Sequence, residues 1–222
     1  MATRQLQVYL DLMSQPCRAV QILLDSTEIP HTVRTVALRR GENRTPDFTE
    51  LNPMQKVPVL VEEDFILTES DAIMKYLATR YDVPEHWYPR QPERRYTAWH
   101  QTNTRPHAAK VFILEVLLPG QTGSQVDEGR LIRALSQLED TLDKLESMFL
   151  RRQPFLCGDD ITVADLLAVC ELMQPLGGGR DVLRRRPKLQ RWRSRVQAAV
   201  GESFDRAHAV LYALRDRRKA KL

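Results

Sequence analysis

The chain has 222 residues, of which 42% are hydrophobic and 28% are charged. This mixture is typical of a folded globular protein, and it excludes a disordered, collagen-like or membrane-embedded chain. No run approaches the ~18 apolar residues of a transmembrane helix. Three cysteines without a CxxC pair, and five histidines without metal-ligand spacing, indicate a reducing compartment and no metal site.

The net charge of +4 is divided unevenly along the chain. Residues 1–83 carry 9 Lys and Arg against 12 Asp and Glu, whereas residues 84–222 carry 24 against 17. Such a basic excess can attract nucleic acid or an anionic membrane, but no helix-turn-helix, zinc-finger or RNA-binding aromatic motif accompanies it. We therefore interpret it as a solvated helical surface, and we expect neither nucleic acid nor membrane as a partner.

The first 83 residues alternate short apolar runs with amphipathic segments, which is the rhythm of an α/β unit. The pattern predicts a strand, a helix, a strand, a two-stranded hairpin and a helix over residues 6–10, 17–26, 31–36, 57–61, 65–67 and 70–81. A parallel crossover would join the first two strands, and a polar stretch, 39–52, follows the second one. This order, βαβ followed by ββα, predicts a thioredoxin-like domain over residues 1–83.

The strand signals stop at a proline-marked linker, which we place at residues 84–91, and residues 92–222 are predicted to be all-helical. Leucines from Leu131 onward recur at three- and four-residue spacing, as expected of a long helix that packs on a core. Thr162 and Asp165 form a capping box with Asp in place of Glu, and Pro187 suits the first turn of a further helix. Thr162 and Asp165 are therefore predicted structural residues.

This domain order and three motifs resemble the cytosolic glutathione transferases. Pro58 opens the third strand where that family has a cis-proline, Glu69 and Ser70 match its motif at the start of the third helix, and the capping box falls where the family keeps one. Stretches that are similar to the theta class in particular are 10–20, 64–70, 85–89 and 171–175. The resemblance implies a homodimeric, cytoplasmic enzyme that uses glutathione as co-substrate and needs no other cofactor.

The theta class uses a serine hydroxyl after the first strand to stabilise the glutathione thiolate, and Ser14 occupies that position. By spacing alone, Ser14 is better explained as the cap of a helix that has Pro16 in its first turn, but the matching loop sequence favours the role at the thiolate. Arg105 falls where some theta proteins place an arginine that stabilises an anionic leaving group, although Pro106 is unexpected inside a predicted helix. The resemblance thus implies Ser14 and Arg105 as catalytic residues.

The resemblance assigns six residues to glutathione binding, namely Asn43, Arg44, Lys56, Val57, Glu69 and Ser70. Ser70 would bind the γ-glutamyl carboxylate, and Glu69 would pair with the glutamyl amine. Val57 would hydrogen-bond the cysteinyl backbone, and Lys56 would meet the glycyl carboxylate. Arg44 keeps a cation where theta proteins often have a basic pair, but it changes the geometry.

The predicted function is attack of the glutathione thiolate on small hydrophobic electrophiles, such as alkyl or aryl halides, sulfate esters and hydroperoxides, in detoxification. The alternative is a catalytically weak or non-enzymatic binding or assembly module of the same fold. The basic C-terminal region supports that alternative, as does the end of the chain at Leu222, since theta proteins usually continue into a segment that covers the site. The ending Ala220-Lys221-Leu222 resembles a peroxisomal address, and a nuclear location is a further alternative to the cytoplasm.

Overall fold

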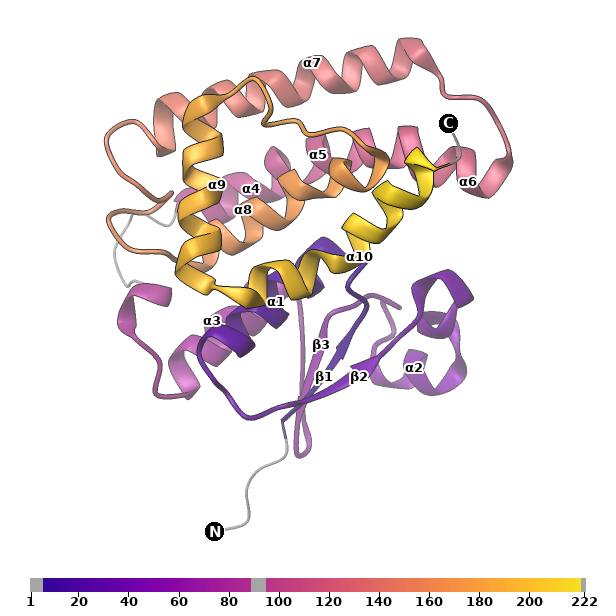
Figure 1. Cartoon of the computed structure of the whole chain (residues 1–222). Coiled ribbons are helices and arrows are strands. Elements are labelled where there is room, and N and C mark those ends of the chain that lie inside the picture. Colours follow the sequence, from indigo (N-terminus) through magenta and orange to yellow (C-terminus); the bar gives the residue numbers. More distant parts are fainter. Residues whose placement is uncertain (1–5, 89–94, 221–222) are drawn as a thin grey trace.

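The computed structural model describes residues 6–88 and 95–220, which form a sheet-containing N-terminal part and a helical C-terminal part packed against each other (Figure 1). The N-terminal elements are β1 (Leu6–Leu10), α1 (Gln15–Ser26), β2 (Thr32–Thr35), η1 (Leu38–Arg40), η2 (Glu42–Arg44), α2 (Pro46–Leu51), β3 (Val59–Glu62), β4 (Phe65–Thr68) and α3 (Ser70–Arg80). The predicted thioredoxin-like order is confirmed.

The four strands form one sheet in the order β2-β1-β3-β4. Strand β1 runs parallel to β2 and antiparallel to β3, and β3 pairs with β4 as the predicted hairpin. Leu6, Val8 and Leu10 alternate with more exposed residues along β1 and are almost completely buried. This period of two places one row of β1 side chains in the core, and the central position of β1 fixes the loop that follows it at the middle of the sheet.

The predicted start of the first helix needs correction. Helix α1 begins at Gln15 rather than Cys17, because Pro16 lies in the first turn, where a missing N–H costs no hydrogen bond. The polar stretch 39–52, to which the sequence pattern assigns no element, contains the end of η1, all of η2 and the helix α2. The Thr45 hydroxyl caps α2 by accepting from the Phe48 amide, and Phe48 is the buried anchor of this short helix.

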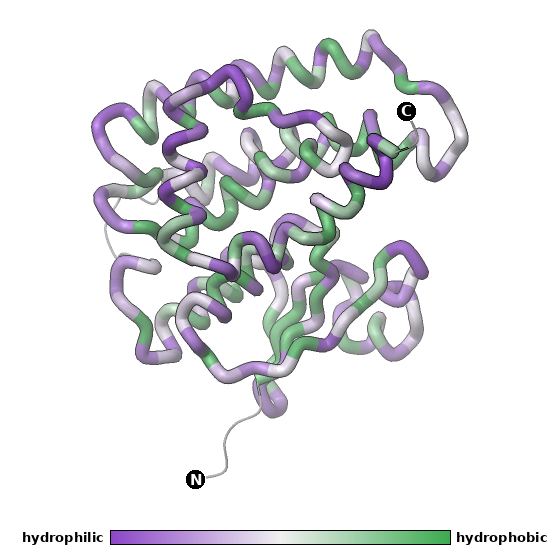
Figure 2. Tube along the Cα trace, in the orientation of Figure 1, coloured by the Kyte–Doolittle hydropathy of each residue, from purple (hydrophilic) through white to green (hydrophobic). Residues whose placement is uncertain are grey.

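The C-terminal part is helical, as predicted, and a single bridge between Phe155 and Gly158 is the exception among the described residues. Its elements, with η3 before them, are η3 (Glu85–Trp87), α4 (Arg95–Thr102), α5 (Thr104–Phe112), η5 (Ile113–Leu117), α6 (Leu118–Thr122), α7 (Glu128–Lys144), η6 (Leu145–Phe149), α8 (Val163–Met173), η7 (Gln174–Gly178), α9 (Pro187–Val200) and α10 (Glu202–Lys219). All 11 residues of α8 are buried, and Figure 2 shows the apolar character of this central helix. Residues 89–91 of the predicted linker lie outside the described residues, as do Lys221 and Leu222.

The capping box at the start of α8 is confirmed, and its Asp165 carboxylate also binds two other segments, the loop at Leu156 and helix α9. Asp165 accepts hydrogen bonds from the amide (3.0 Å) and the hydroxyl (3.0 Å) of Thr162. It also accepts from the Leu156 amide (2.9 Å) and the Trp192 indole N–H (2.8 Å). Burial raises the pKa of Asp165, and these four donors oppose that rise by favouring the carboxylate.

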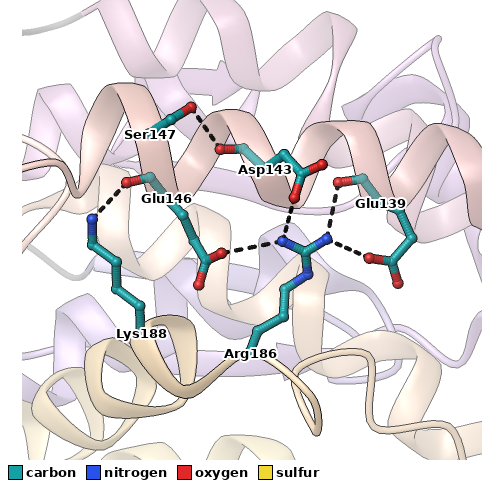
Figure 3. Close-up of polar contacts among 6 residues, drawn as sticks. All are labelled: Glu139, Asp143, Glu146, Ser147, Arg186 and Lys188. Carbon is teal, nitrogen blue, oxygen red and sulfur yellow. Dashed lines mark hydrogen bonds and ion pairs between the residues drawn. The ribbon is translucent and has the colours of Figure 1, made fainter.

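Part of the basic excess works inside the fold rather than facing solvent. Arg186, just before α9, donates to Asp143 (2.6 Å) and Glu146 (3.2 Å) and also to Glu139, so that one guanidinium spans an acidic ridge on α7 and η6 (Figure 3). Lys188 donates to the Glu146 carbonyl at 2.6 Å. The interpretation of this region as a solvated surface is therefore incomplete, because these side chains join α9 to α7.

No helix among the described residues has both the length and the apolar composition needed to span a bilayer.

Candidate active site

The loop after β1 presents Ser14 at the start of α1. The Asp11 carboxylate holds this loop by accepting from the amides of Met13 (2.8 Å) and Leu38 (3.0 Å), and the Ser14 amide donates to the Asp11 carbonyl (2.8 Å). Ser14 occupies the N-cap position of α1, but within the described chain its side chain makes no capping hydrogen bond. The capping role that spacing allows is therefore not the one its hydroxyl performs here.

The thiol of Cys17 lies one turn into α1 and is completely buried. Burial raises its pKa to about 12, although a hydrogen bond with Ser14 opposes this rise. A thiol with this pKa is protonated at neutral pH, so Cys17 is a packing residue and not a nucleophile.

A buried guanidinium holds the Ser14 loop from behind. Arg18 is fully buried and donates to the carbonyls of Leu12 (2.7 Å) and Cys170 (2.9 Å) and to the side-chain oxygen of Gln174 (2.5 Å). Gln174 in turn donates to the Met13 carbonyl at 3.2 Å. The two residues before Ser14 are thus fixed by side chains from α1 and from η7.

Sequence reasoning gave no role to Arg18 or Gln174, although a signal for both was present. Each lies in a stretch singled out for its similarity to the theta class, 10–20 and 171–175, and the structure brings these stretches into contact. The hydrogen bonds between the two stretches hold the backbone before Ser14, and neither stretch alone reveals them.

Ser14 opens onto a cavity of about 390 Å³ between the two parts of the chain. The apolar walls of this cavity come from Met13, Leu38, Ala109, Phe112, Ile113 and Leu117. Its polar groups include Ser14, Arg105 and Glu171. This combination suits a small apolar molecule that carries one reactive polar group.

A second, smaller cleft brings together four of the six residues predicted to bind glutathione. Lys56, Val57, Glu69 and Ser70 all line it, together with Pro58, and the Val57–Pro58 peptide bond is cis as expected. Glu69 has a φ of 66°, a left-handed value that is uncommon for a residue other than glycine. Ser70 follows as the first residue of α3 and is buried.

Asn43 and Arg44 lie elsewhere, along a broader groove between η2 and α10. Asn43 donates its side-chain amide to the Gln55 carbonyl at 2.8 Å, which fixes the residue before Lys56. The structure therefore places this pair along a different groove from the other four residues, and the Gln55 carbonyl links Asn43 to the chain just before Lys56.

Arg105 stands where the two cavities meet, since it lines both of them. Its Nε lies 3.9 Å from Glu171 Oε1, and 36% of its side chain is exposed. Helix α4 ends at Thr102 and α5 begins at Thr104, so Pro106 falls in a first turn and does not interrupt a helix. The unexpected proline is explained by this boundary.

Glu171 is an ionisable side chain of the larger cavity that sequence reasoning did not consider. It is 2% exposed, and burial raises its pKa to about 8 against the opposing effects of Arg105 and Arg18. Among the described residues, no group of three or more His, Cys, Asp and Glu side chains is arranged to hold a metal ion. The site therefore combines a hydroxyl, a guanidinium and a carboxyl around one cavity.

Comparison with known proteins places this arrangement in a family. Residues 5–79 match the family model for the N-terminal domain of glutathione S-transferase, and residues 110–199 match that for its C-terminal domain. The chain belongs to the glutathione S-transferase family. It is 45% identical to glutathione S-transferase theta-1 of Bos taurus, over 97% of this chain and 92% of the bovine protein.

Solved structures agree with this assignment of the transferase. The apo form of human glutathione-S-transferase T1-1 matches with a TM-score of 0.91 and 43% identity, over 95% of this chain and 91% of the human one. A human theta-class transferase in complex with the glutathione conjugate of 1-menaphthyl sulfate matches with a TM-score of 0.92 and 38% identity, over 98% and 91%. The predicted class, a theta-type glutathione transferase with a thioredoxin-like and an all-α part, is confirmed.

Proposed function

We propose that this transferase binds glutathione in the cleft of Lys56, Val57, Glu69 and Ser70 and transfers it to a small hydrophobic electrophile in the 390 Å³ cavity. The observation that carries the proposal is the position of Arg105, which lines both spaces and so marks the point where thiol and electrophile would meet. The complex of the human relative with a glutathione conjugate supports the same pairing of sites.

In this proposal the Ser14 hydroxyl donates a hydrogen bond to the glutathione sulfur. A free thiol has a pKa of roughly 8.5, so the thiolate needs about one to two pKa units of stabilisation to dominate near neutral pH. One unit corresponds to about 1.4 kcal/mol, and a hydrogen bond to a charged partner contributes roughly 1.5–3 kcal/mol. A single hydroxyl is therefore sufficient, and the N-terminus of the 12-residue helix α1 adds to it.

The thiolate would then attack the electrophilic centre of a halide or a sulfate ester. The sulfur electron pair forms the new bond to carbon, and the bond from carbon to halogen or to sulfate oxygen breaks with its electron pair leaving on the anion. Arg105 stabilises that anion, because a guanidinium stays charged at every relevant pH and donates in a fork. Hydroperoxides would be attacked at oxygen in the same cavity.

Replacing Ser14 by Ala tests this mechanism. Followed against pH through its ultraviolet band, the thiolate of bound glutathione should show a pKa raised by about one to two units, with kcat lowered about tenfold or more and affinity for glutathione nearly unchanged. S147A, which removes an exposed hydroxyl that donates to the Asp143 carbonyl, is the matched control. A thiolate pKa and a rate that both equal those of the wild type would contradict the role of Ser14.

We also propose that the transferase acts as a cytoplasmic homodimer, as the resemblance implies. Two large apolar side chains support a protein contact at strand β4, since Phe65 and Ile66 are 44% and 46% exposed. Light scattering should give twice the chain mass of 25.7 kDa, and a monomer would contradict this part of the proposal.

A further inference from the structure

The proposed mechanism assigns no role to the carboxyl group of Glu171. Glu171 lies on the central helix α8 and lines the same cavity as Ser14 and Arg105. Its Oε2 is buried and has no hydrogen-bond partner among the described residues. Buried polar atoms are almost always paired, and this oxygen belongs to a side chain that lines a cavity, where a bound molecule can supply its partner.

The groups that face Glu171 come from several helices. Arg18 on α1 and Arg105 on α5 favour its charged form, and the Gln15 side chain donates a hydrogen bond to it. Its neighbour Cys170 stays a neutral thiol, because burial raises the pKa of that thiol to about 12. Tyr96 on α4 also stays neutral, since burial holds its pKa well above the ordinary value.

Burial outweighs both arginines and raises the pKa of Glu171 to about 8. The side chain therefore carries a proton in most molecules at neutral pH. A carboxyl that is protonated at neutral pH and releases its proton near pH 8 has the properties of a general acid. Its position in a cavity beside a fixed cation indicates the direction of transfer, because Arg105 stabilises the carboxylate that remains.

We propose that Glu171 donates a proton to the leaving oxygen of electrophiles whose leaving group is an alkoxide. Organic hydroperoxides are the class of electrophile that needs this proton most. This inference rests on the proposed function, because it requires a glutathione thiolate at Ser14. Halides leave as weak bases and need no proton. Glu171 is thus a residue that determines which acceptors react.

The step balances as follows for a hydroperoxide. The thiolate sulfur attacks the terminal oxygen, a sulfur–oxygen bond forms, and the oxygen–oxygen bond breaks with its electron pair on the alkoxide. Glu171 gives its proton to that oxygen, so an alcohol leaves while the sulfur is oxidised to a sulfenic acid. A second glutathione converts the sulfenic acid to the disulfide and water. The Glu171 carboxylate regains a proton from the next glutathione thiol as that thiol ionises.

The test compares two acceptors in the same enzyme sample. E171Q keeps the shape of the side chain and removes its transferable proton, and kcat/KM is measured with cumene hydroperoxide and with 4-nitrobenzyl chloride. We expect a loss of about 100-fold or more with the hydroperoxide, the usual contribution of general acid catalysis, and a change below about threefold with the chloride. E128Q, at an exposed glutamate on α7, is the matched control.

The pH dependence supplies a second readout. The wild-type rate with hydroperoxide should fall as the pH rises through about 8, whereas the rate with chloride should not, and E171Q should lose that fall. A ratio of the two rates that is the same in E171Q as in the wild type would overturn the inference, whether both rates are unchanged or both fall equally. A wild type that uses the chloride but not the hydroperoxide would overturn it alone, and a wild type inactive with both would overturn the proposed function as well.

Discussion

The buried guanidinium of Arg18 joins the two parts of the chain behind the Ser14 loop, and its removal should affect stability and catalysis together. Three oxygen atoms accept from it, at 2.7, 2.9 and 2.5 Å. A hydrogen bond from a charged donor contributes roughly 1.5–3 kcal/mol, and an acceptor left buried without a donor carries a further penalty. Arg18→Met therefore breaks a network that connects residues more than 150 positions apart.

The net loss should be smaller than the sum of these terms. Methionine fills much of the same volume with apolar atoms, and removal of the charge also removes the cost of keeping it out of water. A buried neutral acceptor left without a donor costs about 1–3 kcal/mol, and with three such acceptors we expect R18M to lower the free energy of unfolding by about 3–5 kcal/mol. The thiolate pKa of bound glutathione should also rise, because the backbone before Ser14 loses the hydrogen bond from Arg18 that fixes it.

Urea unfolding at one fixed protein concentration measures this change. R191M is the matched control, since Arg191 is exposed on α9 and the substitution is chemically the same. The control should differ from the wild type by less than about 0.5 kcal/mol. A loss below about 1 kcal/mol in R18M would refute the reasoning, because it would mean that water satisfies the three oxygens once the guanidinium is gone.

Two further substitutions test separate parts of the structure. Asp165→Asn should lower the free energy of unfolding, measured in urea, by about 2–4 kcal/mol, because four donors then face a neutral amide. D160N, at an exposed aspartate, is its control. Equal stability of the two variants would contradict the role of Asp165. Ser70→Ala should weaken glutathione binding about tenfold in calorimetry, as expected for one lost hydrogen bond, and an unchanged Kd would count against the assignment of Ser70.

The sequence was sufficient for most of the fold because the elements follow clear periodicities. Strand β1 alternates, and Thr162 with Asp165 announces the start of α8. Helix α2 escaped detection because it has six residues and one buried side chain, too few for a helical period to show. Its only signal is the capping pair of Thr45 and Pro46.

The candidate site also contains residues that the sequence could predict and residues that it could not. Lys56, Val57, Glu69 and Ser70 come from neighbouring stretches of one domain, and these four of the six residues that the family resemblance assigned to glutathione share a cleft. Arg18 and Glu171 could not be predicted in this way, since their roles depend on a contact between α1 and α8. In sequence, Glu171 is one acidic residue in an apolar helix, and only the cavity beside it shows what it faces.

Three buried ionisable groups predict that stability is greatest near pH 6.5. Burial lowers the pKa of His100 and of His208 to about 3, so below pH 6.5 the unfolded chain binds protons that the folded chain refuses. Stability from these two is present above pH 6.5 and is lost as the pH falls. Glu171 has the opposite sign: its pKa is raised to about 8, so its stabilising effect is complete below pH 4.5 and is lost as the pH rises through 8.

Each group changes the free energy of unfolding by about 1.4 kcal/mol per pH unit within its window. Between pH 4.5 and 6.5 the two histidines oppose Glu171, which leaves a net rise of about 1.4 kcal/mol per unit. Between pH 6.5 and 8 Glu171 acts alone among the three, and the slope reverses. Urea unfolding should therefore give values about 2 kcal/mol lower at pH 5 and at pH 8 than at pH 6.5. E171Q should lose the alkaline fall and should show a steeper acid limb, about 2.8 kcal/mol per unit between pH 4.5 and 6.5, because only the two histidines then act there. A wild type whose stability keeps rising through pH 8 would mean that Glu171 is ionised in the folded protein.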